Sequence, residues 1–155
     1  MGWTIAQIRT AYAALSPAPS SLAAAVAALN AQTQTVTVDV PVQSIAGYLG
    51  SQNKLVPFLE WAASPPAGAA AVAVGAAKAL ALALQNSGAF PVFQMANATV
   101  AANMENDLSA LVNPGTGIAA PITAADQTAI LALASQTVPI WQPALTIADL
   151  QTAGL

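Results

Sequence analysis

The sequence predicts a mainly α-helical domain built around a central alanine-rich helix, with one short extended β segment at about residues 34–40. Three observations support this fold class. An apolar run at 65–84 is rich in alanine and glycine and carries one charge, Lys78. Helix-capping signals recur ahead of segments whose apolar residues have helical spacing. Residues 34–40 instead alternate between apolar and polar side chains, as a strand does. We expect a single domain, 1–155.

The N-terminal part of the chain predicts a helical hairpin. Thr4 and Gln7 have the spacing of a capping box, in which the hydroxyl and the amide side chain satisfy free backbone amides of the first turn. The helix that they open is expected to end in the Pro-rich segment that follows. Ser20 or Ser21 can cap a second helix, which ends near Asn30.

The segment QTVTVDV at 34–40 is the clearest departure from helical patterning. Its apolar face consists of three β-branched residues, Val36, Val38 and Val40. A strand cannot satisfy its backbone groups alone, so it needs a partner. Two alternatives remain open: pairing within the chain with a weak partner such as 91–95 or 138–141, or strand addition to a neighbouring subunit. The second alternative makes the three valines candidate interface residues.

The central run at 65–84 follows two shorter helices, one capped by Ser44 and one at 54–63. A helix that is apolar all round is buried in a domain or spans a membrane. Its length of about 19 residues reaches the lower range for a span. Its alanine and glycine content and Lys78 favour a buried helix, with the lysine reaching the surface or pairing with Glu60. We therefore expect no membrane span.

The C-terminal part predicts three further elements. Asn97 is expected to cap a long helix, and Thr123 with Asp126 forms a second capping box. An extended segment at 138–143 comes next. A third capping box, Thr146 to Asp149, opens a terminal helical turn.

Composition limits the class of function. The chain is 56% hydrophobic and 6% charged, with a mean hydropathy of +0.61, whereas an ordinary domain carries about 25% charged residues. We therefore expect much of the surface to be covered by other subunits. The net charge is −3, and the three cations are scattered. Because nucleic-acid binding requires clustered Lys or Arg, no nucleic-acid partner is expected.

Catalytic signals are weak. The chain contains neither Cys nor His. Glu105 and Asp107 are two apart on a helix and so lie on different faces. We predict no enzyme, no catalytic or metal-binding residues, no cofactor and no small-molecule substrate. Among the aromatic residues, Trp61 is expected to anchor a helix to the core. For Trp3 and Trp141 two alternatives remain open: each anchors a helix to the core, or each is an interface residue, because tryptophan is enriched at interface hot spots.

A family resemblance adds to these expectations. Residues 29–33 with the Val/Thr strand, residues 42–49, and the C-terminal stretches ITAADQTAILALA and VPIWQPALTIADLQTAG resemble small Ala-rich proteins encoded in the late structural modules of tailed bacteriophages and prophages. The resemblance implies a non-enzymatic virion part, of the tail or its tip, assembled in the host cytoplasm. Its partners would be other virion proteins and copies of itself. The alternatives are a head decoration protein and an accessory or assembly protein missing from the mature particle.

Overall fold

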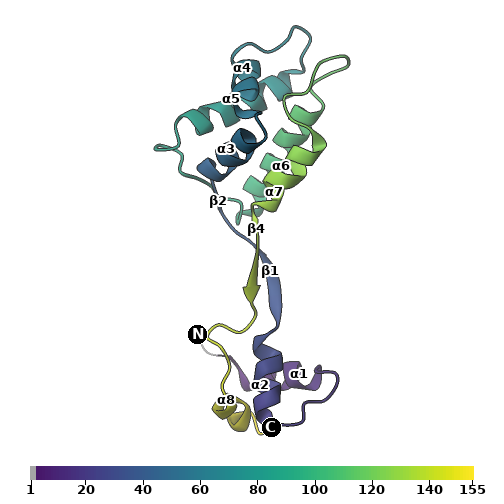
Figure 1. Ribbon diagram of the computed structural model, residues 1–155, viewed down its shortest axis with the longest axis vertical. Coiled ribbons are helices and arrows are strands. Elements are labelled where there is room, and N and C mark those ends of the chain that lie inside the picture. The colour runs from purple at the N-terminus through teal and green to yellow at the C-terminus, as the bar shows by residue number, and fades with distance from the viewer. Residues whose placement is uncertain (1–2) are drawn as a thin grey trace. The chain divides into compact units, whose positions relative to one another are not determined.

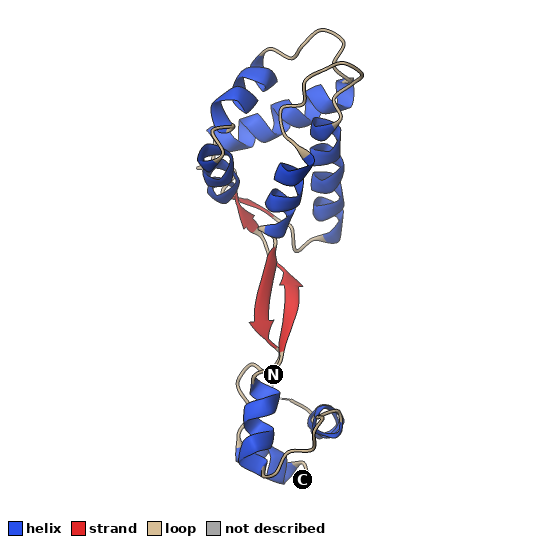
Figure 2. Ribbon diagram, turned by 45° about the vertical axis from the view of Figure 1, so that its right-hand side comes forward, coloured by secondary structure: helices blue, strands red, loops and turns tan. Residues whose placement is uncertain are grey.

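The computed structural model describes residues 3–155 and is mainly α-helical (Figures 1 and 2). The described chain forms eight helices and four short strands, which confirms the predicted fold class. Its residues group into two compact units. We call 37–136 the central unit, and the N-terminal segment to Val36 together with Thr137–Leu155 the terminal unit.

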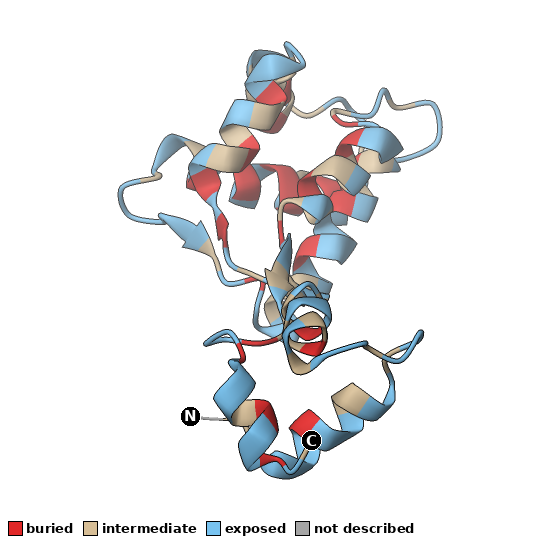
Figure 3. Ribbon diagram, turned by 60° about the horizontal axis from the view of Figure 1, so that its bottom comes forward, coloured by how far each residue is buried: buried red, intermediate tan, exposed pale blue. Residues whose placement is uncertain are grey.

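The sequence predicts a single domain, 1–155, which stays a prediction; within the described residues the chain groups into two compact units, and Met1 and Gly2 lie outside those residues. The physical reason is that apolar residues near both ends of the chain build a core of their own. Figure 3 shows buried positions on the helices of both units. The core of the terminal unit contains the buried residues Ile8, Ala25, Leu29, Trp141, Leu145, Leu150 and Ala153.

The terminal unit brings the two ends of the chain together. Its helices are α1 (Ile5–Ala13), α2 (Leu22–Asn30) and α8 (Ile147–Thr152). The Asn30 side chain accepts a hydrogen bond from the Leu145 amide (2.8 Å) and donates one to the Leu145 carbonyl (2.9 Å). Arg9 Nε donates to the Ala153 carbonyl (2.6 Å). These bonds hold the last helix against the first two.

The central unit is a group of helices around the predicted central helix. Its helices are α3 (Val42–Ser51), α4 (Leu55–Ala63), α5 (Ala71–Gln85), α6 (Ala98–Val112) and α7 (Ala124–Ala132). Helix α5 contacts α3, α4 and α6, and α7 contacts α3 and α6. The largest fully buried side chain is that of Phe58 on α4. Small alanine side chains on α5 allow its neighbours to pack closely around it.

Helix α5 is only partly enclosed, which corrects the expectation of burial on most sides. Ala73, Ala77 and Leu80 are buried, whereas Val72 and Leu82 are 70% and 54% exposed. The helix also begins later than expected, because residues 65–70 form a turn in which Gly68 has φ +90°. That backbone conformation is outside the α-helical region.

Helix starts follow the capping signals closely. The predicted capping boxes open α1, α7 and α8, and the side chains of Ser21 and Asn97 cap α2 and α6. Helix α3 is the exception. It begins at Val42 with Pro41 at its N-cap, so the predicted cap at Ser44 is wrong.

The predicted strand at 34–40 is divided into two strands with different partners. β1 (Thr33–Thr37) pairs with β4 (Ser135–Pro139), and the chain passes between the units in these strands. β2 (Val40–Pro41) pairs antiparallel with β3 (Val92–Phe93). The division lies at Asp39, whose carboxylate accepts a hydrogen bond from the Ala96 amide (3.1 Å). Both partners belong to the same chain, as the first of the two alternatives expected.

Candidate interaction surfaces

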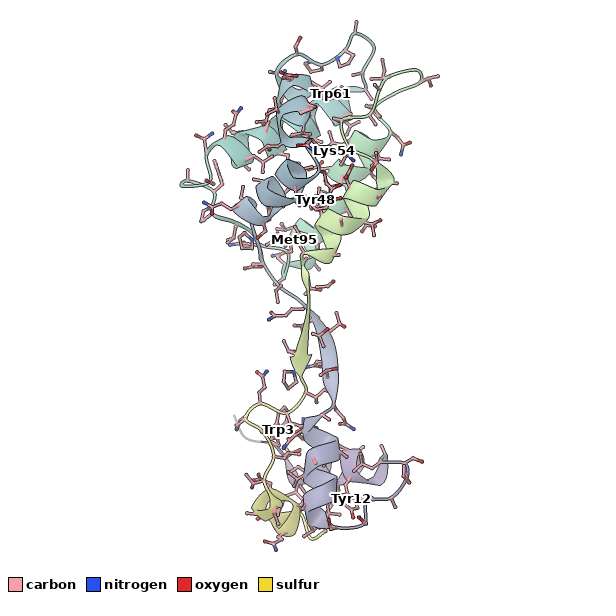
Figure 4. All side chains as sticks on the ribbon, viewed as in Figure 1. Trp3, Tyr12, Tyr48, Lys54, Trp61 and Met95 are labelled. Carbon is pink, nitrogen blue, oxygen red and sulfur yellow. The ribbon has the colours of Figure 1, made fainter. Side chains whose placement is uncertain are left out.

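An open apolar groove lies on the terminal unit beside α1. Its volume is about 500 Å³, and it is lined by Trp3, Ala6, Gln7, Thr10, Ala11, Ala14, Gln32, Ile140 and Trp141. Trp3 and Trp141 meet edge to face, with ring centroids 4.7 Å apart and an interplanar angle of 69°. Such pairs contribute about 0.5–1.5 kcal/mol beyond the burial of their area. Figure 4 shows Trp3 close to the start of the chain.

Hydrogen bonds fix both indole rings. Trp3 Nε1 donates to the Pro143 carbonyl (3.1 Å), and Trp141 Nε1 donates to Gln32 Oε1 (3.3 Å). Gln7 is held by the capping box, where its Oε1 accepts from the Thr4 amide (2.9 Å). The groove is therefore a preformed apolar surface with amide groups at its edge. A surface of this kind has the chemistry to accept an apolar side chain.

The groove brings together the two tryptophans that the sequence analysis proposed as interface residues. Trp3 remains half-buried, so part of its ring is available to a partner. Trp141 is only 4% exposed and belongs to the core of the terminal unit. Most of the Trp141 ring is therefore buried beneath the groove, and little of it contributes to the exposed groove surface.

The three valines proposed for strand addition do not form a shared free face. Val40 is 2% exposed and lies in the core of the central unit, so its assignment to an interface is corrected. Val36 and Val38 are half-buried. The Val38 amide donates to the Ala134 carbonyl (2.7 Å) within the same chain. This bond agrees with pairing within the chain, the first of the two alternatives that the sequence left open.

A buried polar cluster joins three helices of the central unit. Asp126, 2% exposed, forms a salt bridge with Lys54 and accepts hydrogen bonds from the Tyr48 hydroxyl (2.9 Å) and the Thr123 amide (2.7 Å). Tyr48 is on α3, Lys54 precedes α4, and Asp126 is in the first turn of α7. Figure 4 shows Tyr48 and Lys54 close together beside α7. The cluster fixes these helices relative to one another.

The environment of Asp126 sets its ionisation. Burial alone raises the pKa of its carboxyl, but the hydrogen bonds from Lys54, Thr123 and Tyr48 outweigh burial and hold the pKa at about 2. Burial and the neighbouring Asp126 carboxylate raise the pKa of the Tyr48 hydroxyl. Sequence reasoning identified Asp126 as a capping residue but missed the salt bridge. No local pattern connects Lys54 with a residue 72 positions away.

The other charged positions considered in the sequence are on the surface. Lys78 is exposed on α5, and within residues 3–155 the one salt bridge is that between Lys54 and Asp126, so the proposed pairing of Lys78 with Glu60 is absent. Glu105 and Asp107 are both exposed on α6. Partial burial nevertheless raises the pKa of the Asp107 carboxyl.

Comparison with known proteins gives no family assignment. No family model, no curated protein and no solved structure matches the chain. Among the described residues, no helix combines the length and the apolar character that crossing a bilayer requires.

Proposed function

We propose that this protein is a non-enzymatic structural component of a tailed-bacteriophage virion, a subunit of the tail or its tip that acts through protein–protein contacts. One observation carries the proposal: the central unit exposes several large apolar side chains on a chain that is only 6% charged. These are Val56 (63% exposed), Val72 (70%), Leu82 (54%), Phe90 (51%) and Val92 (43%).

Exposed apolar residues matter here because the rest of the surface offers little charge. Single exposed apolar side chains are common on any protein. In most domains, however, abundant Lys and Glu keep the molecules apart, and here their number is small. Covering apolar area contributes about 25 cal/mol per Å². A permanent assembly gains this free energy and removes the tendency to aggregate.

The apolar groove of the terminal unit supports the same proposal. Its lining contains Trp3 and Trp141, and tryptophan is a residue type on which binding free energy is concentrated at interfaces. The groove and the exposed residues of the central unit give the chain separate surfaces for separate partners. A subunit inside a particle needs more than one contact surface.

The test is to locate the chain on particles. Particles induced from the host strain that encodes the chain are purified by density gradient and labelled with a gold-conjugated antibody raised against the purified protein. Labelling at the tail is the expected result. Labelling over the head assigns the chain to head decoration and overturns the tail assignment. Chain found only in the unassembled fraction of the lysate overturns the virion proposal.

A further inference from the structure

The exposed face of α5 carries a regular apolar stripe, which we call the α5 stripe. It consists of Val72, Gly75, Ala79 and Leu82, all exposed. Their spacing of three, four and three residues is that of the a and d positions of a coiled-coil seam. Val72 and Leu82 at its two ends are the most exposed large apolar side chains of this helix. The α5 stripe is therefore shaped to receive another helix along its length.

Gly75 at the centre of the α5 stripe is not explained by packing within the chain. Glycine in the middle of a helix is destabilising relative to alanine. A Cβ added at Gly75 meets nothing within 4 Å, and the backbone φ of Gly75 is not positive. Gly47 on α3 is equally open, but it is not part of an apolar stripe of this kind. At Gly75 the absence of a side chain allows a second backbone to approach closely from outside.

Two opposite charges flank the α5 stripe. Lys78 lines the hollow between α5 and α4, together with Leu59 and Leu82. Asp107 lines the hollow between α5 and α6, together with Ala79. Since Ala79 follows Lys78 directly in the sequence, the two charges lie at a similar height along α5. Neither takes part in a salt bridge among the described residues.

Charge complementarity identifies the partner as a second copy of the chain and sets the relative direction of the two α5 helices. A two-fold axis parallel to α5 exchanges the α4 side and the α6 side, so that Lys78 faces Asp107 of the partner subunit and the partner's Lys78 faces Asp107. An axis perpendicular to α5 instead places each charge opposite its own copy, which is repulsive. Partial burial raises the pKa of the Asp107 carboxyl because burial disfavours its charged form. A lysine that faces Asp107 offsets this cost.

We propose that the protein forms a parallel two-fold dimer in which the α5 stripes of two copies pack together and Lys78 of each copy pairs with the partner's Asp107. The interface is isologous, because the same residues contribute from both sides. This inference deepens the proposed function, since it names one of the contacts on which that function rests. Its test needs no virus particle.

The experiment is sedimentation equilibrium of the purified full-length chain over a range of concentrations. We expect a monomer–dimer equilibrium for the unchanged protein. Lys78→Glu and Asp107→Lys each place like charges opposite each other and should weaken the dimer by about tenfold or more. The double variant, and an equimolar mixture of the two single variants, should restore it. Glu105→Lys changes the charge on another face of α6 and serves as the matched control, with no expected effect.

A steric variant provides an independent test. Gly75→Leu fits the free chain, because the site is open, but it prevents close approach of the two helices. It should abolish the dimer while helical circular dichroism is retained. Gly47→Leu is the matched control at another open helical glycine and should leave the dimer intact.

Three results would overturn the proposal: a monomer at all concentrations, a dimer that tolerates Gly75→Leu, or a dimer that Lys78→Glu and Asp107→Lys leave unchanged. The last result indicates an antiparallel arrangement, in which each changed charge still faces its own copy. A failure of the dimer proposal can be distinguished from a failure of the proposed function. A monomeric chain found on particles removes only the dimer, whereas an intact dimer in a chain absent from particles removes only the virion assignment.

Discussion

Asp126 is the position where a single side-chain change tests the packing of the central unit most sharply. Its carboxylate is 2% exposed and accepts hydrogen bonds from Lys54, Tyr48 and Thr123. Asp126→Asn keeps the shape of the side chain but removes its charge. The Lys54 ammonium then loses its partner, although its side chain is 33% exposed and can regain some water.

The expected loss follows from the pKa. The carboxyl has a pKa of about 2 in the folded chain against a reference of 3.8. At 1.36 kcal/mol per pKa unit, the difference corresponds to about 2 kcal/mol of unfolding free energy at neutral pH. Because the folded pKa is lowered, this stabilisation is complete above the unfolded value and is lost as the pH falls towards the folded value. At pH 3 about half of it remains.

The assay is urea unfolding followed by helical circular dichroism at pH 7 and at pH 3. Asp126→Asn should lower the unfolding free energy at pH 7 by about 2–3 kcal/mol. At pH 3 the difference in unfolding free energy between the variant and the unchanged protein should be smaller by about 1 kcal/mol. Asp149→Asn is the matched control, because Thr146 and Asp149 form the same capping box without a lysine. Asp149→Asn should lower the unfolding free energy by less than Asp126→Asn does. Equal losses for the two variants, or a gap that does not change with pH, would refute this reasoning.

Substitutions at three further positions test other parts of the account. Phe58→Ala removes the largest fully buried side chain and should cost about 3–5 kcal/mol in urea unfolding; a loss below 1 kcal/mol would contradict its place in the core. Asn97→Ala removes the cap of α6 and should cost about 1 kcal/mol, whereas Asn97→Asp should preserve stability. Trp3→Ala removes the edge-to-face partner of Trp141 and should diminish the near-ultraviolet circular dichroism of the indoles. An unchanged aromatic spectrum would show that the two rings are not in contact.

Helix positions were predictable because their signals are local. A capping box such as Thr4 to Gln7 satisfies backbone amides within four residues, so the pattern and the structure coincide. Asn97 and Ser21 act in the same way. The cap at Ser44 failed because Pro41, whose fixed φ favours a helix start, lies just upstream and begins α3 earlier.

The arrangement of the chain in two units was not predictable from these signals. Hydrophobic periodicity shows which face of a helix is apolar but not which core receives it. The link between Asn30 and Leu145 spans 115 positions and leaves no pattern in the sequence. The exposure of α5 was missed for a related reason: Val72 and Leu82 look like core residues in a run that is apolar throughout.

The interface role of Trp3 stays a prediction, and the structure shows only that Trp3 lines a groove, while Val40 lies in a core. A strand pattern cannot distinguish a partner in the same chain from one in another chain, since both satisfy the same backbone groups. Strand β3 lies within the first weak partner segment named from the sequence, 91–95, whereas β4 overlaps the second, 138–141, only at residues 138–139.

The central claim is that the chain is a structural part of a virion. Quantitative mass spectrometry of gradient-purified particles tests it most directly, by comparing the amount of this chain with that of the major capsid protein. The account predicts a constant ratio from one preparation to the next, retained after a high-salt wash, because the contacts are largely apolar. Absence of the chain from purified particles, or a ratio that falls towards zero on washing, would contradict the account.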